Sequence, residues 1–123
     1  MTRRIVCIAT FVLMAANFTA AEPNRVQKLP KLLDLGANKC IPCKKMAPVL
    51  EELKKEYTGK LEVEFIDVWK DESAAKKFGI NLIPTQIFYD ADGKELYRHQ
   101  GFYGKQDIIA KWRELGVKFS DSK

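Results

Sequence analysis

Apolar and polar positions follow several distinct patterns along the chain. In residues 61–68 apolar and acidic side chains alternate, which is typical of a half-buried strand. In residues 43–57 the apolar side chains recur at spacings of three and four, with lysine and glutamate between them, which predicts an amphipathic helix. Residues 105–115 repeat the helical spacing. These patterns predict strands and helices that alternate along the chain.

Shorter segments complete the order of elements. They are a strand at residues 31–37, a helix at 71–78, a strand at 86–89, a turn at 90–93 and a strand at 95–99. The last two strands and their turn predict a hairpin. The order β-α-β-α-β-β-α predicts an α/β fold with a mixed β-sheet flanked by helices, because strand–helix–strand units pair in parallel and a hairpin pairs antiparallel.

The first 21 residues have a different pattern. A basic start precedes an apolar run over residues 5–16, and small side chains follow, with Thr19 and Ala21 placed as in a cleavage site. The apolar run is shorter than the roughly 20 residues of a membrane-spanning helix. We therefore predict a signal peptide over residues 1–21, a mature domain over residues 22–123, and a periplasmic or secreted protein. An uncut membrane anchor is the alternative.

Composition excludes several classes of protein. The chain of 123 residues is 46% hydrophobic and 30% charged, which indicates one globular domain rather than a disordered chain. The predicted leader takes two arginines with it, which lowers the formal net charge from +5 to +3. Without a basic run interleaved with aromatic residues, we expect no nucleic-acid partner. The pattern indicates no extra apolar surface, so we also expect a monomer.

Two cysteines remain after removal of the leader, Cys40 and Cys43, at a predicted junction between strand and helix. Cysteines three positions apart can close a small disulfide ring there, and the positive helix N-terminus favours a thiolate. We predict that the outer Cys40 is the nucleophile and that Cys43, further into the helix, is the resolving cysteine. A purely structural disulfide and half of a metal site are the alternatives, although His99 is the only histidine.

Around this pair the sequence resembles the thioredoxin family, over residues 30–116. The matched features are Pro42 before the second cysteine, Pro48 in the active-site helix, the segment Ile83, Pro84 and Thr85, the acid Asp34 and the glycine Gly101. The resemblance implies a thioredoxin-like fold that is trimmed at the N-terminus, because the family's usual first strand and helix are missing or compressed here.

The resemblance also implies roles for these residues. Pro84 would follow a cis peptide bond and leave the backbone of Ile83 facing a groove in which a substrate strand pairs by edge addition. This groove would be lined by Ile41, Pro42, Ile83, Pro84, Thr85 and Gly101. Asp34 would be the buried acid under the active site. On an apolar strand it would be desolvated, which raises its pKa, and it would take the proton from Cys43. The alternatives are a trans proline that starts a strand and an exposed aspartate on an edge strand.

The implied activity is that of a thiol–disulfide oxidoreductase without a cofactor or metal, acting on protein disulfides and thiols. Ile41 and Pro42 offer no donor side chain to a thiolate, so we expect a reducing potential nearer the thioredoxin value of about −270 mV than the oxidant value of about −120 mV. By resemblance, electrons would come from a membrane thiol transporter of the DsbD or CcdA type. A disulfide oxidant or isomerase on the same fold is an alternative, and a thiol chaperone for Cu(I) or haem maturation is another.

The sequence also departs from the family pattern. Lys39 stands where thioredoxins usually have tryptophan before the first cysteine. Trp69 and Trp112 lie elsewhere, and we predict that both are packing residues. We expect Asp67 to be a solvated or strand-end residue and His99 to be an ordinary surface or packing residue.

Overall fold

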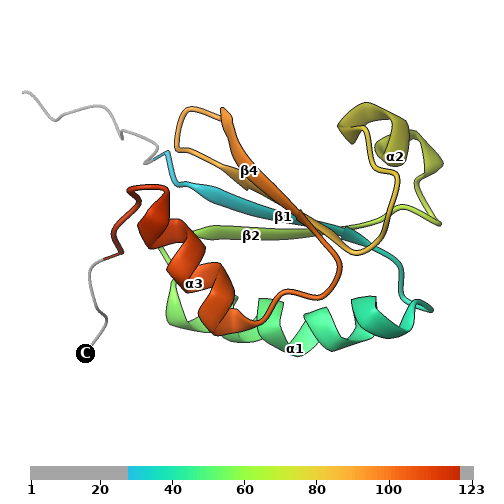
Figure 1. The fold of residues 1–123 in the computed structure, drawn as a ribbon, viewed down its shortest axis with the longest axis horizontal. Coiled ribbons are helices and arrows are strands. Elements are labelled where there is room, and N and C mark those ends of the chain that lie inside the picture. Colours follow the sequence, from blue (N-terminus) through green and yellow to red (C-terminus); the bar gives the residue numbers. More distant parts are fainter. Residues whose placement is uncertain (1–27, 120–123) are drawn as a thin grey trace, which may run out of the picture.

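The computed structural model describes residues 28–119, and its elements follow the predicted order (Figure 1). They are β1 (Lys31–Gly36), α1 (Ile41–Glu56), β2 (Glu62–Asp67), α2 (Glu72–Phe78), β3 (Thr85–Tyr89), β4 (Glu95–Gln100) and α3 (Lys105–Glu114). Over this range no helix has the length and apolar character needed to cross a membrane. The predicted signal peptide and its cleavage site lie outside the described residues, as does any element before Lys28.

The four strands form one mixed sheet in the order β2-β1-β3-β4. β1 pairs in parallel with β2 and antiparallel with β3, and β3 and β4 form the predicted antiparallel hairpin. α1 and α3 lie along one face of this sheet, and α2 lies near one end of it (Figure 1). The predicted α/β class with a mixed, helix-flanked sheet is confirmed.

Two apolar clusters hold these layers together. The larger joins the sheet to α1 and α3, and its fully buried members are Leu32, Met46, Leu53, Phe88, Ile108 and Trp112. The smaller lies on the other face of the sheet beside α2, and its buried members are Leu33, Leu35, Val68, Ala74 and Ile87. β1 contributes Leu32 to the first and Leu33 to the second because consecutive strand residues point to opposite faces.

The two tryptophans have different surroundings. Trp112 lies fully buried in the larger cluster, as predicted. Trp69 is 57% exposed, so the prediction that it is a packing residue was wrong. It lies in the turn between β2 and α2, beyond the last residue of the strand, and the strand pattern therefore does not carry its side chain into the sheet.

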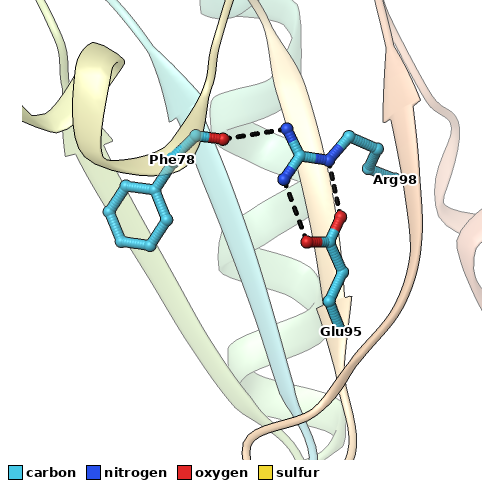
Figure 2. A network of polar contacts seen from close by, with 3 residues as sticks. All are labelled: Phe78, Glu95 and Arg98. Carbon is cyan, nitrogen blue, oxygen red and sulfur yellow. Dashed lines mark hydrogen bonds and ion pairs between the residues drawn. The ribbon is translucent and has the colours of Figure 1, made fainter.

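Arg98 on β4 ties the end of α2 to the sheet (Figure 2). Its Nη1 donates a hydrogen bond of 2.9 Å to the carbonyl oxygen of Phe78, the last residue of α2. Its Nε and Nη2 pair with the two carboxylate oxygens of Glu95 at 2.5 and 3.0 Å. Gly79 follows the helix and caps it with a left-handed φ of 64°. These contacts fix the helix end from which the loop of residues 80–84 departs.

Candidate functional site

Cys40 and Cys43 form a disulfide at the N-terminus of α1. Cys40 precedes the helix with an extended backbone, and its Sγ accepts a hydrogen bond of 3.3 Å from the backbone N–H of Cys43. The two Cα atoms are 5.1 Å apart. Pro42 lies in the first turn, where its missing N–H leaves no helical hydrogen bond unmade. This local geometry is also why α1 begins at Ile41, before the predicted start at Cys43.

The two sulfurs differ in their access to solvent. Cys40 is half-buried. Cys43 is only 4% exposed, because it lies in the first turn of α1 and packs against Gly36 at the end of β1. Only Cys40 can therefore meet a large reactant directly. The predicted order of an outer and an inner cysteine is confirmed, and their separate chemical roles stay predictions.

The electrostatic surroundings of Cys40 are positive. The first turn of α1 contains no acidic side chain, and the helix N-terminus carries a partial positive charge. Lys39, Lys44 and Lys45 are exposed and form no ion pair with any of residues 28–119. These charges stabilise a Cys40 thiolate over the thiol, and solvent screening keeps the contribution of each lysine small.

Gly36, the last residue of β1, lies against the inner cysteine. A Cβ atom at this position would meet Sγ of Cys43 at 3.2 Å, Cβ of Cys43 at 3.3 Å and the ring of Phe65 at 3.2 Å. A side chain at position 36 would therefore press on Cys43 and Phe65, which would have to shift by a few tenths of an ångström. Sequence reasoning missed Gly36, although a glycine at the end of a strand just before the cysteine pair was a usable signal.

Replacing Gly36 with alanine should displace Cys43 and slow its attack on a mixed disulfide. We expect a loss of about 1–3 kcal/mol in the free energy of unfolding, the usual cost of overpacking a core. Urea unfolding and single-turnover kinetics would measure the two effects. Gly104→Ala is the control, because its Cβ would meet the side chain of Asp107 at 3.1 Å, far from the cysteines in the chain. If Gly36→Ala resolves a mixed disulfide at the wild-type rate, the close packing of Gly36 against Cys43 does not matter for the reaction, and this prediction is wrong.

The peptide bond between Ile83 and Pro84 is cis, as the resemblance implied, so the alternative of a trans proline is wrong. Pro84 and Thr85 are buried and Ile83 is half-buried. The N–H of Gly101 donates to the carbonyl oxygen of Pro84 at 2.7 Å, which brings these two predicted groove residues together. Thr85 also pairs with Leu35, next to Gly36 on β1. The proline segment therefore lies at the same end of the sheet as Cys43.

Asp34 is fully buried on β1, so the alternative of an exposed edge-strand aspartate is wrong. Its Oδ1 accepts a hydrogen bond of 2.9 Å from Nε2 of Gln86. Its Oδ2 is buried and has no hydrogen-bond partner among the described residues. Burial raises the pKa of Asp34 from the ordinary 3.8 to about 6, and the Gln86 bond opposes part of that rise. A carboxyl group with such a pKa can exchange a proton near neutral pH.

Gln86 and His99 extend this buried group, and sequence reasoning gave neither of them a role. Nδ1 of His99 lies 3.1 Å from Oε1 of Gln86, and the His99 ring stacks on Tyr103 with ring centroids 3.9 Å apart. His99 was expected to be an ordinary surface or packing residue. It is half-buried, stacks on Tyr103 as a packing residue would, and also belongs to a polar network. The available signal was a glutamine directly before the apolar run of residues 87–89 in a predicted strand.

The surface around the cysteines carries exposed apolar side chains. Ile41 is 72% exposed, Leu82 is 52% exposed and Phe102 is 48% exposed. They are sequence neighbours of Cys40, Ile83 and Gly101, respectively. A hollow of about 1100 Å³ contains none of the predicted site residues, and the hollow beside Cys43 measures only about 200 Å³. The candidate site is thus an open surface suited to another polypeptide rather than an enclosed small-molecule pocket.

Asp67 lies at the end of β2, as expected. Its carboxylate accepts hydrogen bonds from the backbone N–H groups of Asn38, Trp69 and Lys70. Burial raises its pKa, but these bonds outweigh burial and hold the pKa below its usual range. Asp67 therefore organises the turn after β2 and is ionised at neutral pH.

The chain is similar in sequence to known thioredoxins. The family model described as Thioredoxin matches residues 9–114. The thioredoxin of Staphylococcus haemolyticus is 41% identical over 83 residues, which are 68% of this chain and 79% of that protein. The thioredoxin of Staphylococcus aureus is 38% identical over 85 residues, which are 69% of this chain and 81% of that protein.

Solved structures give the same result. A chloroplastic thioredoxin z is similar with a TM-score of 0.66 and 25% identity, over 73% of this chain and 80% of that one. The thioredoxin of Fasciola hepatica is similar with a TM-score of 0.63 and 31% identity, over 72% of this chain and 82% of that one.

Proposed function

This chain belongs to the thioredoxin family and is a thiol–disulfide oxidoreductase, and from that premise we propose that it reduces protein disulfides outside the cytoplasm. The observation that carries the proposal is the asymmetry of the cysteine pair. Cys40 is accessible at a positive helix N-terminus, and Cys43 is buried beside it. This asymmetry supports Cys40 as the nucleophile and Cys43 as the resolving thiol.

The proposed reaction has two exchange steps. The Cys40 thiolate attacks one sulfur of a substrate disulfide, a mixed disulfide forms, and the other substrate sulfur leaves as a thiolate. Cys43 then gives up its proton and attacks Sγ of Cys40, which forms the Cys40–Cys43 disulfide and releases the second substrate thiolate. Two electrons pass to the substrate. Asp34 accepts the Cys43 proton, because it is a buried carboxyl with one oxygen free among the described residues.

The substrate polypeptide binds beside the proline segment in this proposal. β3 begins at Thr85, so the backbone of Ile83 lies outside the pairing of the sheet and is available to a substrate strand. Pro84 follows Ile83 directly, and Gly101 is held next to it by the hydrogen bond from its N–H to the carbonyl oxygen of Pro84. The exposed side chains of Ile41 and Pro42 next to Cys40 give the substrate apolar contact.

The direction of electron flow follows from the residues between the cysteines. Neither Ile41 nor Pro42 has a side chain that could donate a hydrogen bond to the Cys40 thiolate, and the hydrogen bond that Cys40 Sγ accepts comes from the backbone N–H of Cys43. A less stabilised thiolate makes the dithiol a better reductant. Lys39 works in the opposite direction, but an exposed lysine is screened by solvent. We therefore assign a reducing role.

The proposed location rests on residues 1–21. Their basic start, apolar run and small residues before Glu22 support a secretory leader. A reductant outside the cytoplasm must be recharged, and we propose a membrane thiol transporter of the DsbD or CcdA type as the donor. We also propose that the protein acts as a monomer.

The reduction potential of the Cys40–Cys43 pair tests the proposed direction. The protein would be equilibrated with dithiothreitol and glutathione buffers and its thiols trapped. We expect a potential near or below about −220 mV, because neither residue between the cysteines has a donor side chain that would stabilise the thiolate. A potential of about −120 to −180 mV would instead identify an oxidant or isomerase. Stoichiometric Cu(I) binding without disulfide-exchange turnover would identify a metal chaperone.

A further inference from the structure

A buried polar chain crosses the sheet at the level of the site. Asp34 on β1 lies opposite Gln86 on β3, and Gln86 lies opposite His99 on β4. Asp34 and Gln86 are fully buried, and His99 is half-buried. All three point to the face that packs against α1 and α3, since Leu32, Phe88 and Tyr97, two residues along their respective strands, belong to that cluster or pack against it. The strand register alone therefore brings three polar side chains into one row.

The hydrogen bonds of this row have one consistent direction. Nε2 of Gln86 donates to Oδ1 of Asp34, so its Oε1 faces His99. An amide oxygen can only accept a hydrogen bond, and Nδ1 of His99 must therefore carry the hydrogen that lies between them. The stacked ring of Tyr103 holds the imidazole in this orientation. Each residue thus fixes the next one toward Asp34.

This direction decides which oxygen of Asp34 is free. Gln86 occupies Oδ1, and Oδ2 is left buried without a partner among residues 28–119. Gly36 lies two residues beyond Asp34 on the same strand face and is in contact range of Cys43. We propose that Gln86 and His99 are positioning residues that hold Oδ1 of Asp34 and leave Oδ2 to accept the proton of Cys43. The inference rests on the proposed role of Asp34 as proton acceptor.

The groups that face Asp34 come from several elements. β3 places Gln86 and β2 places Phe65 opposite Asp34, α1 brings Cys43 to Gly36 two residues further along β1, and β4 brings His99 to Gln86. Burial raises the pKa of Asp34, and the hydrogen bond from Gln86 opposes part of that rise. The hydrogen bond stabilises the charged carboxylate, so weakening it at either end of Gln86 raises the pKa of Asp34 further. A glutamine that only filled a polar gap would not transmit a change at His99.

Three substitutions separate positioning from packing. Gln86→Met keeps the length of the side chain and removes both hydrogen bonds. His99→Phe keeps an aromatic ring on Tyr103 and removes Nδ1, whereas His99→Asn returns an amide N–H close to the position of Nδ1. Gln106→Met makes the same exchange as the first variant at an exposed position of α3 and is the control.

Two measurements read the outcome. Carbon-13 NMR would follow the titration of the Asp34 carboxyl in the oxidised protein, and single-turnover trapping would follow the resolution of a mixed disulfide. We expect Gln86→Met to raise the Asp34 pKa and to slow resolution at neutral pH about tenfold, the effect of one charge-assisted hydrogen bond. His99→Phe should also raise the Asp34 pKa and should slow resolution about threefold. His99→Asn should recover most of the resolution rate. Gln106→Met should change neither the Asp34 pKa nor the resolution rate.

The outcomes distinguish the inference from its premise. If the Asp34 titration is the same in the wild type, His99→Phe and His99→Asn, or if both His99 variants change it equally, the positioning role is overturned. If Asp34→Asn resolves mixed disulfides at the wild-type rate, the proton-acceptor role fails, and the proposal falls with it. The carboxyl titration still shows in that case whether His99 acts on Asp34 through Gln86, because it needs no turnover.

Discussion

Replacing Cys40 with serine should abolish the reduction of insulin disulfides, with a fall in rate of at least about a thousandfold. Disulfide exchange needs a thiolate, and a serine hydroxyl does not ionise near neutral pH. Cys43 cannot take over the first step, because it is only 4% exposed and packs against Gly36. The assay is the turbidity of insulin reduced by dithiothreitol, which the wild-type protein should accelerate.

Cys43→Ser is the matched variant, and its expected behaviour is different. Its accessible Cys40 still attacks the substrate, but the mixed disulfide is not resolved, so a covalent protein–substrate adduct should accumulate. Non-reducing electrophoresis and mass spectrometry would detect this adduct, which Cys40→Ser cannot form. An adduct in Cys40→Ser and none in Cys43→Ser would reverse the two roles.

The sequence predicted the elements and the cysteine pair because both depend on local patterns. The alternation over residues 61–68 became β2, and the helical spacing after Cys43 became most of α1. The burial of Asp34 was also predictable, since an acid inside a short apolar strand has apolar neighbours on both sides. Matched family residues then indicated the cis bond before Pro84.

The remaining features depend on how the elements pack. Gln86 and His99 meet only through the register of β3 with its two neighbouring strands, and no local pattern encodes that register. The tight fit at position 36, where glycine leaves room for Cys43, arises from the approach of α1 to the end of β1. Trp69 was placed wrongly because its aromatic character gives no information on which element covers a turn.

Replacing Asp34 with asparagine should slow the resolution of mixed disulfides about a hundredfold at neutral pH, because Cys43 loses its general base. The difference should depend on pH. Burial raises the pKa of Asp34 to about 6, so the wild-type protein also loses the carboxylate as the pH falls below that value. The two resolution rates should therefore converge in acid, and stopped-flow kinetics over this pH range would measure the convergence.

The same substitution should change the pH dependence of stability. The pKa of Asp34 is higher in the folded state than in the unfolded state, so its contribution to stability is complete below the unfolded value of 3.8. That contribution is lost as the pH rises through about 6. The shift of the Asp34 pKa corresponds to a change in the free energy of unfolding on the order of 3 kcal/mol. Relative to Asp34→Asn, the wild-type protein should thus become less stable as the pH rises.

Denaturant unfolding of both oxidised proteins between about pH 3 and pH 8 would measure this change. Burying the asparagine amide of Asp34→Asn has a cost that does not depend on pH. This cost therefore does not affect how the difference in unfolding free energy between the two proteins changes with pH. Asp67→Asn is a control of opposite sign, because the pKa of Asp67 is held below its usual range and its stabilisation is lost as the pH falls. If the difference in unfolding free energy between the wild type and Asp34→Asn does not change with pH, Asp34 has the same pKa in the folded and unfolded states. That result would contradict the role of Asp34 as a buried proton acceptor for Cys43.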